Sequence, residues 1–130
     1  TFVGNQLVRT NHSTNYDWSN LRQLRFAPAD NPDAIQNTVD TGIGEGIADL
    51  CFDGLSIWAL AYRHNQNDSA IRLYRLNGQG AQVSQHDLGN CQGPAGPAGL
   101  ACNGQGLGWI YCWGTDQGNQ STIMGIELPN

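Results

Sequence analysis

The stretch Ser19-Asn20-Leu21-Arg22-Gln23-Leu24-Arg25-Phe26 recurs as Ser69-Ala70-Ile71-Arg72-Leu73-Tyr74-Arg75-Leu76, which lies 50 positions later (69 − 19). Both copies follow the pattern Ser-x-aliphatic-Arg-x-x-Arg-apolar, and the alignment extends without a gap over residues 7–26 and 57–76. A weaker third copy is Ser121-Thr122-Ile123-Met124-Gly125-Ile126-Glu127-Leu128. Repeats with a period of roughly 20–50 residues are typical of propellers, solenoids and related arrays.

Each copy predicts two strands around a polar tip. In the second copy the apolar segment Ser56–Tyr62 and the returning segment Ala70–Leu76 flank the turn-forming residues His64–Asp68. The first and third tips are Asn11–Asn20 and Gly114–Asn119. The repeat cores 7–26, 57–76 and 108–128 therefore belong to a single repeat-built β domain over residues 1–130.

Two Gly- and Pro-rich connectors, residues 27–55 and 77–107, join the three strand pairs. They contain possible short strands at 33–40, 47–52 and 81–88. The fold class is therefore all-β, with three strand-pair repeats of about 50 residues that are propeller-blade-like. A β-trefoil and a β-sandwich are the alternatives. Because no connector follows the third strand pair, we expect the array of repeats to be completed by oligomerisation or by the rest of a longer precursor.

The segment Gly93-Pro94-Ala95-Gly96-Pro97-Ala98-Gly99 looks collagen-like. Two Gly-X-Y triplets are too short for a triple helix, so the segment predicts a loop pinned between Cys91 and Cys102.

The cysteines and sequons indicate an extracellular protein. Cys51, Cys91, Cys102 and Cys112 are even in number and contain no CxxC pair, which favours two disulfides over a metal site and leaves three connectivities open. The chain begins at Thr1 without Met, as expected if a leader has been removed. N-x-S sequons occur at Asn11, Asn67 and Asn119, all within the predicted tips, so we expect a secreted, N-glycosylated protein.

The composition excludes some partners. Charged residues make up 13% of the chain, the net charge is −5 and the pI is near 4.8, which argues against nucleic acid and anionic membrane surfaces. The sequence has no apolar run of about 18 residues, so no membrane insertion is expected. Polarity carried by Asn, Gln, Ser, Thr and Gly suits neutral polar ligands.

Arginine and aromatic residues recur where a sugar could bind. Arg72 and Tyr74 share one face of a predicted strand, and we expect Trp58, in the same hairpin, to lie near them. A guanidinium gives directed donors to sugar oxygens while an aromatic face accepts the C–H patch. The repeat adds Arg22 to this set. Ordinary cross-strand contacts remain the alternative.

The four tryptophans fall into two classes. Trp58 and Trp109 each follow a cysteine by seven positions (58 − 51, 109 − 102) and are expected in the cores of the repeats. Trp18 and Trp113 lie in or beside tips and are candidate exposed stacking platforms.

Catalytic signals are unspecific. The bases that titrate near neutral pH are His12, His64 and His86, and His86 faces away from its neighbour Asp87 on a strand. The sequence holds no nucleophile-elbow or phosphate-loop motif. Spacing selects no glycosidase pair among the acids Asp17, Glu45, Asp49 and Asp53. We therefore expect no enzyme activity, catalytic residue, metal or cofactor. A secreted hydrolase is the third candidate function, after the two given below.

The strands Ile57-Trp58-Ala59-Leu60 and Ile71-Arg72-Leu73-Tyr74 resemble the blades of fungal fucose-binding six-bladed β-propeller lectins. The resemblance implies that Arg72, and by repeat Arg22, contact sugar. Those blades also carry a downstream Glu, which the segment 81–88 lacks. The predicted function is non-catalytic carbohydrate binding, with a glycan or further copies of the chain as partners. The alternative is a structural subunit of an extracellular coat, matrix or filament.

Overall fold

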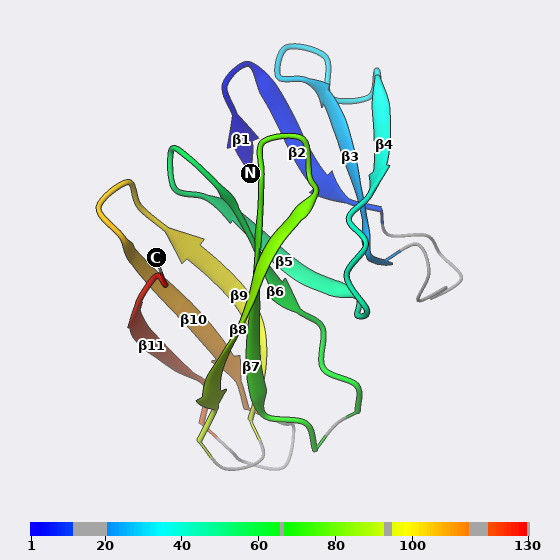
Figure 1. The fold of residues 1–130 in the computed structure, drawn as a ribbon. Coiled ribbons are helices and arrows are strands. Elements are labelled where there is room, and N and C mark those ends of the chain that lie inside the picture. Colours follow the sequence, from blue (N-terminus) through cyan, green and yellow to red (C-terminus); the bar gives the residue numbers. More distant parts are fainter. Residues whose placement is uncertain (12–20, 66, 93–94, 115–119, 130) are drawn as a thin grey trace.

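The computed structural model describes residues 1–11, 21–65, 67–92, 95–114 and 120–129. These residues form three antiparallel sheets that follow one another along the chain (Figure 1). The N-terminal sheet holds β1 (Phe2–Val3), β2 (Gln6–Thr10), β3 (Gln23–Pro28) and β4 (Asn37–Asp40). The central sheet holds β5 (Ile47–Phe52), β6 (Ile57–Ala61), β7 (Ala70–Leu76) and β8 (Gln82–Asn90). The C-terminal sheet holds β9 (Gly96–Cys102), β10 (Leu107–Trp113) and β11 (Thr122–Glu127).

The all-β, blade-like repeat predicted from the sequence is confirmed. Each sheet contains one predicted hairpin, namely β2–β3, β6–β7 or β10–β11, and neighbouring strands in a sheet are consecutive in the chain. The connectors add β4, β5, β8 and β9, and β1 precedes the first repeat core. Within the described part of the chain, no helix is long and apolar enough to cross a membrane.

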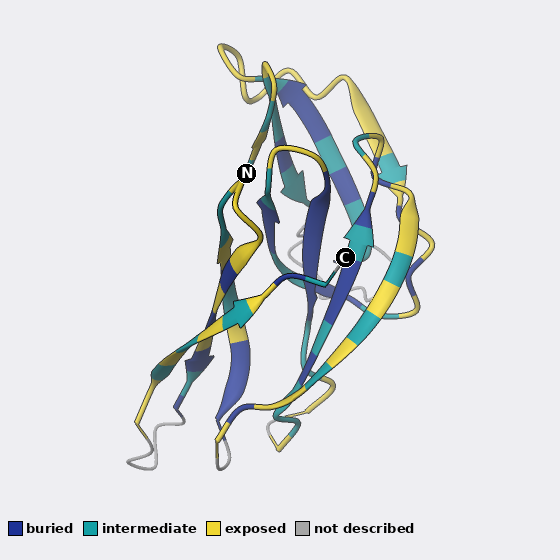
Figure 2. Cartoon of the chain, turned by 60° about the vertical axis from the view of Figure 1, so that its left-hand side comes forward, coloured by how far each residue is buried: buried dark blue, intermediate teal, exposed yellow. Residues whose placement is uncertain are grey.

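The sheets pack face to face in chain order around two apolar clusters. Val8, Leu24 and Phe26 of the N-terminal sheet pack with one face of the central sheet. The other face of the central sheet, with Trp58 and Leu73, packs on the C-terminal sheet. Figure 2 shows the buried residues concentrated in the middle of the molecule and the exposed ones on outer strands and turns.

Two turns share a motif that fixes their shape. Asn-Gly-Gln-Gly occurs at 77–80 between β7 and β8 and again at 103–106 between β9 and β10. In each turn the Asn Oδ1 accepts from the backbone N–H groups two and four residues ahead. The last glycines, Gly80 and Gly106, have φ of 89° and 81°, a region that L side chains rarely adopt.

The gap-free alignment of the first two hairpins is wrong by one residue. That alignment places Arg9 over Ala59 and Arg25 over Arg75. Arg9 pairs with Arg25, but Ala59 pairs with Tyr74. A one-residue slip moves a side chain to the opposite face of a sheet, so Arg22 is not the structural counterpart of Arg72.

Strand boundaries outside the hairpins match in part. The segment 47–52 is β5 as predicted, whereas the predicted strand 33–40 is reduced to β4 and 81–88 becomes β8. The strand β1 had no sequence signal. The prediction of a loop for the collagen-like segment is wrong from Gly96 onward, because β9 begins there and includes Pro97, while Gly93 and Pro94 lie outside the described residues. Proline is tolerated there because β9 is an edge strand with a register irregularity opposite Cys112.

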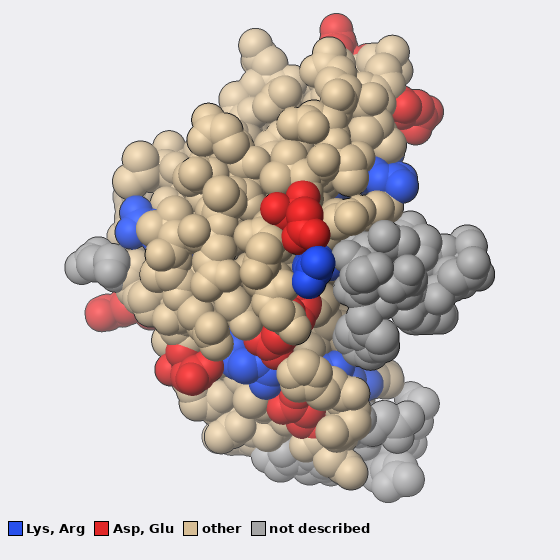
Figure 3. All heavy atoms as spheres, turned by 45° about the vertical axis from the view of Figure 1, so that its right-hand side comes forward, with Lys and Arg blue, Asp and Glu red and all other residues tan. Residues whose placement is uncertain are grey.

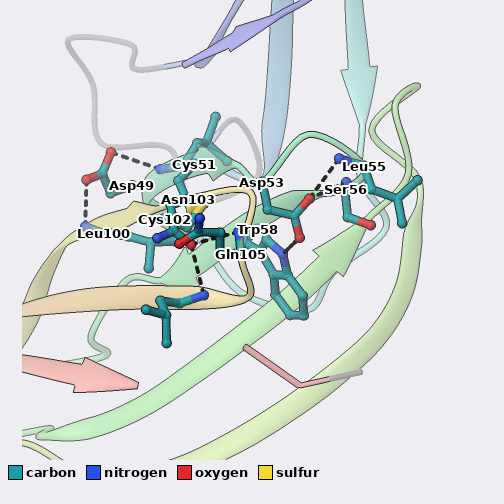
Figure 4. The surroundings of a disulfide bond; sticks show 12 residues. Asp49, Cys51, Asp53, Leu55, Ser56, Trp58, Leu100, Cys102, Asn103 and Gln105 are labelled. Atoms are coloured by element: carbon teal, nitrogen blue, oxygen red, sulfur yellow. Dashed lines mark hydrogen bonds between the residues drawn. A yellow bond between two sulfur atoms is a disulfide. The ribbon is translucent and has the colours of Figure 1, made fainter. Parts of the chain in front are cut away.

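The cysteines form the two predicted disulfides, and the structure gives their connectivity. Cys51 on β5 bonds Cys102 on β9, and Cys91, after β8, bonds Cys112 on β10. Both bonds join the central sheet to the C-terminal sheet. Beside the first, Asp49 Oδ2 accepts the backbone N–H of Leu100 at 2.8 Å (Figure 4).

Candidate functional site

Arg72 and Tyr74 share one face of β7, as predicted, and both contact a residue that the sequence did not single out as their partner. Arg72 Nε donates to Glu45 Oε1 at 2.6 Å, and the Tyr74 hydroxyl donates to Glu45 Oε2. Glu45 lies in the connector before β5, and its side chain is 10% exposed. The Glu45 carboxylate therefore ties this connector to the central sheet.

Asp68, in the second tip, closes the network from the other side. Arg72 Nη2 lies 3.2 Å from Asp68 Oδ2, which also accepts the backbone N–H of His64 at 3.1 Å. His64 Nε2 in turn lies 2.9 Å from Glu45 Oε1. The donors of Arg72 are thus engaged by the protein, and its side chain is only 14% exposed. Arg72 supports the tip rather than presenting free donors.

The network shifts the acidity of its members. Burial alone would raise the pKa of Asp68, but hydrogen bonds from His64, Arg72 and Ala70 outweigh it and hold that pKa below its usual value. Burial alone would lower the pKa of Arg72, but Asp68 and Glu45 raise it. Burial, with the bond to Glu45, raises the pKa of Tyr74. These groups keep their charge states near neutral pH.

Arg63 and Trp113 form a second arrangement beside this network. The Arg63 Cζ lies 5.0 Å from the centroid of the Trp113 ring, within cation–π range. Arg63 Nη1 is buried and has no hydrogen-bond partner among the described residues. Gly96 leaves room for this guanidinium, because a Cβ there would stand 2.9 Å from Arg63 Cδ.

The two arrangements adjoin. A Cβ on Gly96 would also stand 3.3 Å from the backbone oxygen of Asp68, so Asp68 lies between the two parts. We call the set the tip cluster: Glu45, Arg63, His64, Asp68, Arg72, Tyr74 and Trp113. On the face shown in Figure 3, acidic and basic side chains lie against one another in the lower part of the view.

The sequence predicted three members of the tip cluster as sugar contacts, namely Arg72, Tyr74 and Trp113. Arg63 and the role of Glu45 were missed. Glu45 stands 27 positions before Arg72 (72 − 45), and its only local signal is its place between Gly44 and Gly46.

Other predicted contacts lie elsewhere. Arg22 Nη2 pairs with Asp40 Oδ2 at 3.1 Å, and both side chains are more than 40% exposed. The expectation that Trp58 lies beside Arg72 and Tyr74 is wrong, because Trp58 opposes Arg75 across β6 and β7. Its indole Nε1 donates to Asp53 Oδ2 at 2.8 Å (Figure 4).

Trp109 is not a core residue. It is 39% exposed, whereas Trp58 is 1% exposed. Tyr111, two residues along β10, is exposed to the same degree as Trp109. Sequence periodicity indicated which face these side chains occupy but not whether another sheet covers that face.

The predicted glycosylation sites differ in accessibility. Asn67 is exposed, as a glycan requires. Asn11 is 7% exposed and its Nδ2, the atom that would carry a glycan, donates to Gln23 Oε1 at 2.8 Å. Asn11 therefore does not fit that prediction. Trp18, Asn119, His12 and Asp17 lie outside the described residues.

The remaining histidine takes part in local contacts. His86 Nε2 lies 2.8 Å from Ser84 Oγ, and its ring lies 5.9 Å from the Trp58 ring. No group of three or more His, Cys, Asp or Glu side chains is placed to hold a metal ion within the described ranges.

No protein-family model, curated protein or solved structure matched the chain. The resemblance to fungal lectin blades therefore stays a prediction, and a functional proposal has to rest on the geometry of the tip cluster.

Proposed function

We propose that the chain binds carbohydrate without catalysis at the tip cluster, through Arg63 and Trp113. The observation that carries this proposal is the buried Arg63 Nη1, a donor with no partner among the described residues, in a guanidinium held over the Trp113 ring. A buried donor left unpaired costs about 1–3 kcal/mol, which an acceptor on a ligand would recover.

A neutral sugar suits this combination. Its ring oxygen and hydroxyls accept hydrogen bonds from a guanidinium, and its C–H patch packs on an indole. The chain's low charged fraction of 13% also favours a neutral polar ligand over a charged one.

Arg72 acts in this proposal as a support rather than as a sugar ligand. Its bonds to Glu45 and Asp68 supply a positive charge to two carboxylates that lie at low exposure. Asp68 then anchors the backbone of His64, the residue next to Arg63. The network thus fixes the segment that presents Arg63 to Trp113.

The proposed setting is extracellular. Two disulfides fit an oxidising compartment, and Asn67 provides an exposed sequon for a glycan. We propose that the protein is secreted and binds glycans outside the cell.

A glycan array, followed by calorimetry on each hit, tests the proposal. We expect Arg63→Ala and Trp113→Ala each to weaken binding by about 5- to 150-fold, the equivalent of about 1–3 kcal/mol. Arg22→Ala is the matched control, because Arg22 also has a buried nitrogen without a described partner, its Nε, but pairs with Asp40 and does not lie over a described tryptophan ring. Its affinity should equal that of the wild type.

Two outcomes would contradict the proposal. If the folded protein binds no glycan on the array, the proposed function is wrong. If Arg63→Ala and Trp113→Ala both bind as tightly as the wild type, the ligand binds at another surface.

A further inference from the structure

The outer face of the C-terminal sheet is apolar and corresponds to a face that is buried elsewhere in the molecule. In the central sheet, Trp58, Leu60 and Leu73 point toward the C-terminal sheet and are 1%, 0% and 0% exposed. They belong to β6 and β7, the hairpin that corresponds to β10 and β11.

The cross-strand pairs identify the counterparts of these residues. Leu60 pairs with Leu73 in the central sheet, and Tyr111 pairs with Ile123 in the C-terminal sheet. Trp58 and Trp109 lie two residues before Leu60 and Tyr111 on the same strands. Trp109, Tyr111 and Ile123 are 39%, 39% and 71% exposed. Equivalent positions are therefore buried in the central sheet and exposed in the C-terminal sheet.

A shallow groove of about 300 Å³ runs along this exposed face, which we call the tail face. Leu107, Trp109 and Glu127 are among the residues that line the groove. Leu107 is 41% exposed, and Glu127 adds a carboxylate at the edge of an otherwise apolar surface. The described residues leave the tail face without a covering sheet.

The opposite end of the stack carries a complementary surface. Arg9 and Arg25 are directly paired across β2 and β3, on the side away from the core residues Val8 and Leu24. Neither arginine has a hydrogen bond or ion pair with another described side chain, and like charges in direct register destabilise a sheet. We call this surface the head face.

Among the described residues, arginine already packs on tryptophan in two places. Arg75 Cζ lies 5.9 Å from the Trp58 ring centroid, and Arg63 Cζ lies 5.0 Å from that of Trp113. A guanidinium pair and an aromatic pair with a nearby carboxylate are thus surfaces of matching chemistry.

We propose that copies of this chain associate head to tail, with the tail face of one copy packed on the head face of the next. Arg9 and Arg25 would then lie over Trp109 and Tyr111 and near Glu127, and the order of the three sheets would continue across the contact. Such a heterologous contact closes into a ring or extends into a filament. The proposal is independent of sugar binding at the tip cluster.

Sedimentation velocity over a range of protein concentrations tests this contact. The wild type should associate as its concentration rises, and less strongly at high salt, because Arg9, Arg25 and Glu127 are charged. Ile123→Asp and Arg25→Asp should each weaken association at least tenfold. Val83→Asp is the matched control, because Val83 is 59% exposed on β8 and outside both faces.

Mixing the two defective variants distinguishes a head-to-tail contact from a symmetric one. Ile123→Asp retains an intact head face and Arg25→Asp an intact tail face, so an equimolar mixture should give heterodimers and nothing larger. Circular dichroism checks that each variant is folded, and Ile123→Thr replaces Ile123→Asp if the latter does not fold.

Three results would overturn the proposal. They are a wild type that stays monomeric up to about 1 mM, association that survives Arg25→Asp, and association that requires an added polysaccharide. The second indicates a symmetric contact between tail faces, and the third makes the tail face a ligand platform.

Discussion

The two interfaces between sheets bury similar apolar surfaces but differ in how they are secured. Between the N-terminal and central sheets, Val8, Leu24 and Phe26 pack on Tyr74 and Leu76 without a covalent link. Between the central and C-terminal sheets, two disulfides and the Asp49–Leu100 bond reinforce a comparable cluster. All four cysteines are used at this second interface. The molecule is therefore a cross-linked pair of sheets with a third sheet that no disulfide secures.

Removing the bond between Cys51 and Cys102 should have the largest effect on stability. In the chain-entropy model a bond across 51 positions contributes about 4 kcal/mol, and the Cys91–Cys112 bond across 21 positions contributes about 3 kcal/mol. The two variants to compare are Cys51→Ala/Cys102→Ala and Cys91→Ala/Cys112→Ala. We expect the first to have the lower midpoint of urea unfolding. If the Cys91–Cys112 variant had the lower midpoint instead, the length of the closed loop would not determine how much each disulfide stabilises the protein.

Leu24→Ala should loosen the uncross-linked interface selectively. Leu24 is 0% exposed, and truncating a buried leucine costs about 2–5 kcal/mol. Hydrogen exchange should accelerate in β2 and β3 while β6 and β10 keep their protection. Equal loss of protection in all three sheets would show that the interfaces open together, and Val83→Ala on exposed β8 is the control.

Asp53→Ala should destabilise the hairpin at the cross-linked interface by about 1–3 kcal/mol, because it leaves the indole N–H of buried Trp58 unpaired. Asp53 also accepts the backbone N–H groups of Leu55 and Ser56 (Figure 4). Equilibrium unfolding in urea at pH 7 measures this change, with Asp53→Asn as the variant that keeps an acceptor.

The same carboxylate predicts a pH dependence. Burial alone would raise the pKa of Asp53, but hydrogen bonds from Ser56, Trp58 and Leu55 hold it below the ordinary value of 3.8. The stabilisation is therefore present above about pH 3.8 and is lost as the pH falls through the lower, folded-state pKa. The stability difference between the wild type and Asp53→Asn should shrink below pH 3.8. A constant difference down to pH 2 would contradict this assignment.

The smallest effect is expected for Arg22→Ala, at less than about 1 kcal/mol, because Arg22 and Asp40 form an exposed ion pair. Arg72→Ala should cost several times more, since it removes the arginine charge that Glu45 and Asp68 share at low exposure. Thermal unfolding of the two variants compares them directly. An equal loss of stability in the two variants would mean that Arg22 and Arg72 are structurally equivalent, as the sequence repeat suggested.

The sequence predicted the hairpins well because their signals are local. The segments Ile47–Phe52 and Ala70–Leu76 are strands with the predicted bounds. The strand β9 escaped prediction because Pro97 and its glycines read as a loop, and only edge placement makes a strand possible there. Register within a hairpin depends on the number of residues in the tip, which no local pattern fixes.

The tip cluster was harder to predict because its members come from separate parts of the chain. Arg72 and Tyr74 were found through the alternation of a strand, which places them on one face. Glu45 joins them through the pairing of β5 with β6 and of β6 with β7, and Arg63 meets Trp113 where the central and C-terminal sheets stack. Both are long-range events without a local signal. The exposure of Trp109 has the same origin, since burial depends on a covering sheet.

The disulfide arrangement also determines how the molecule would respond to tension between its ends. The polypeptide before Cys51 has no covalent shortcut, so a pulling force can peel away the N-terminal sheet and the start of β5 and release roughly 165–180 Å of extended chain at about 3.3–3.6 Å per residue. Beyond that point the force passes from Cys51 directly to Cys102 through sulfur, and the residues between them carry no load. Strands β6, β7 and β8 are thereby shielded, so the first step of extension is limited to the chain before Cys51.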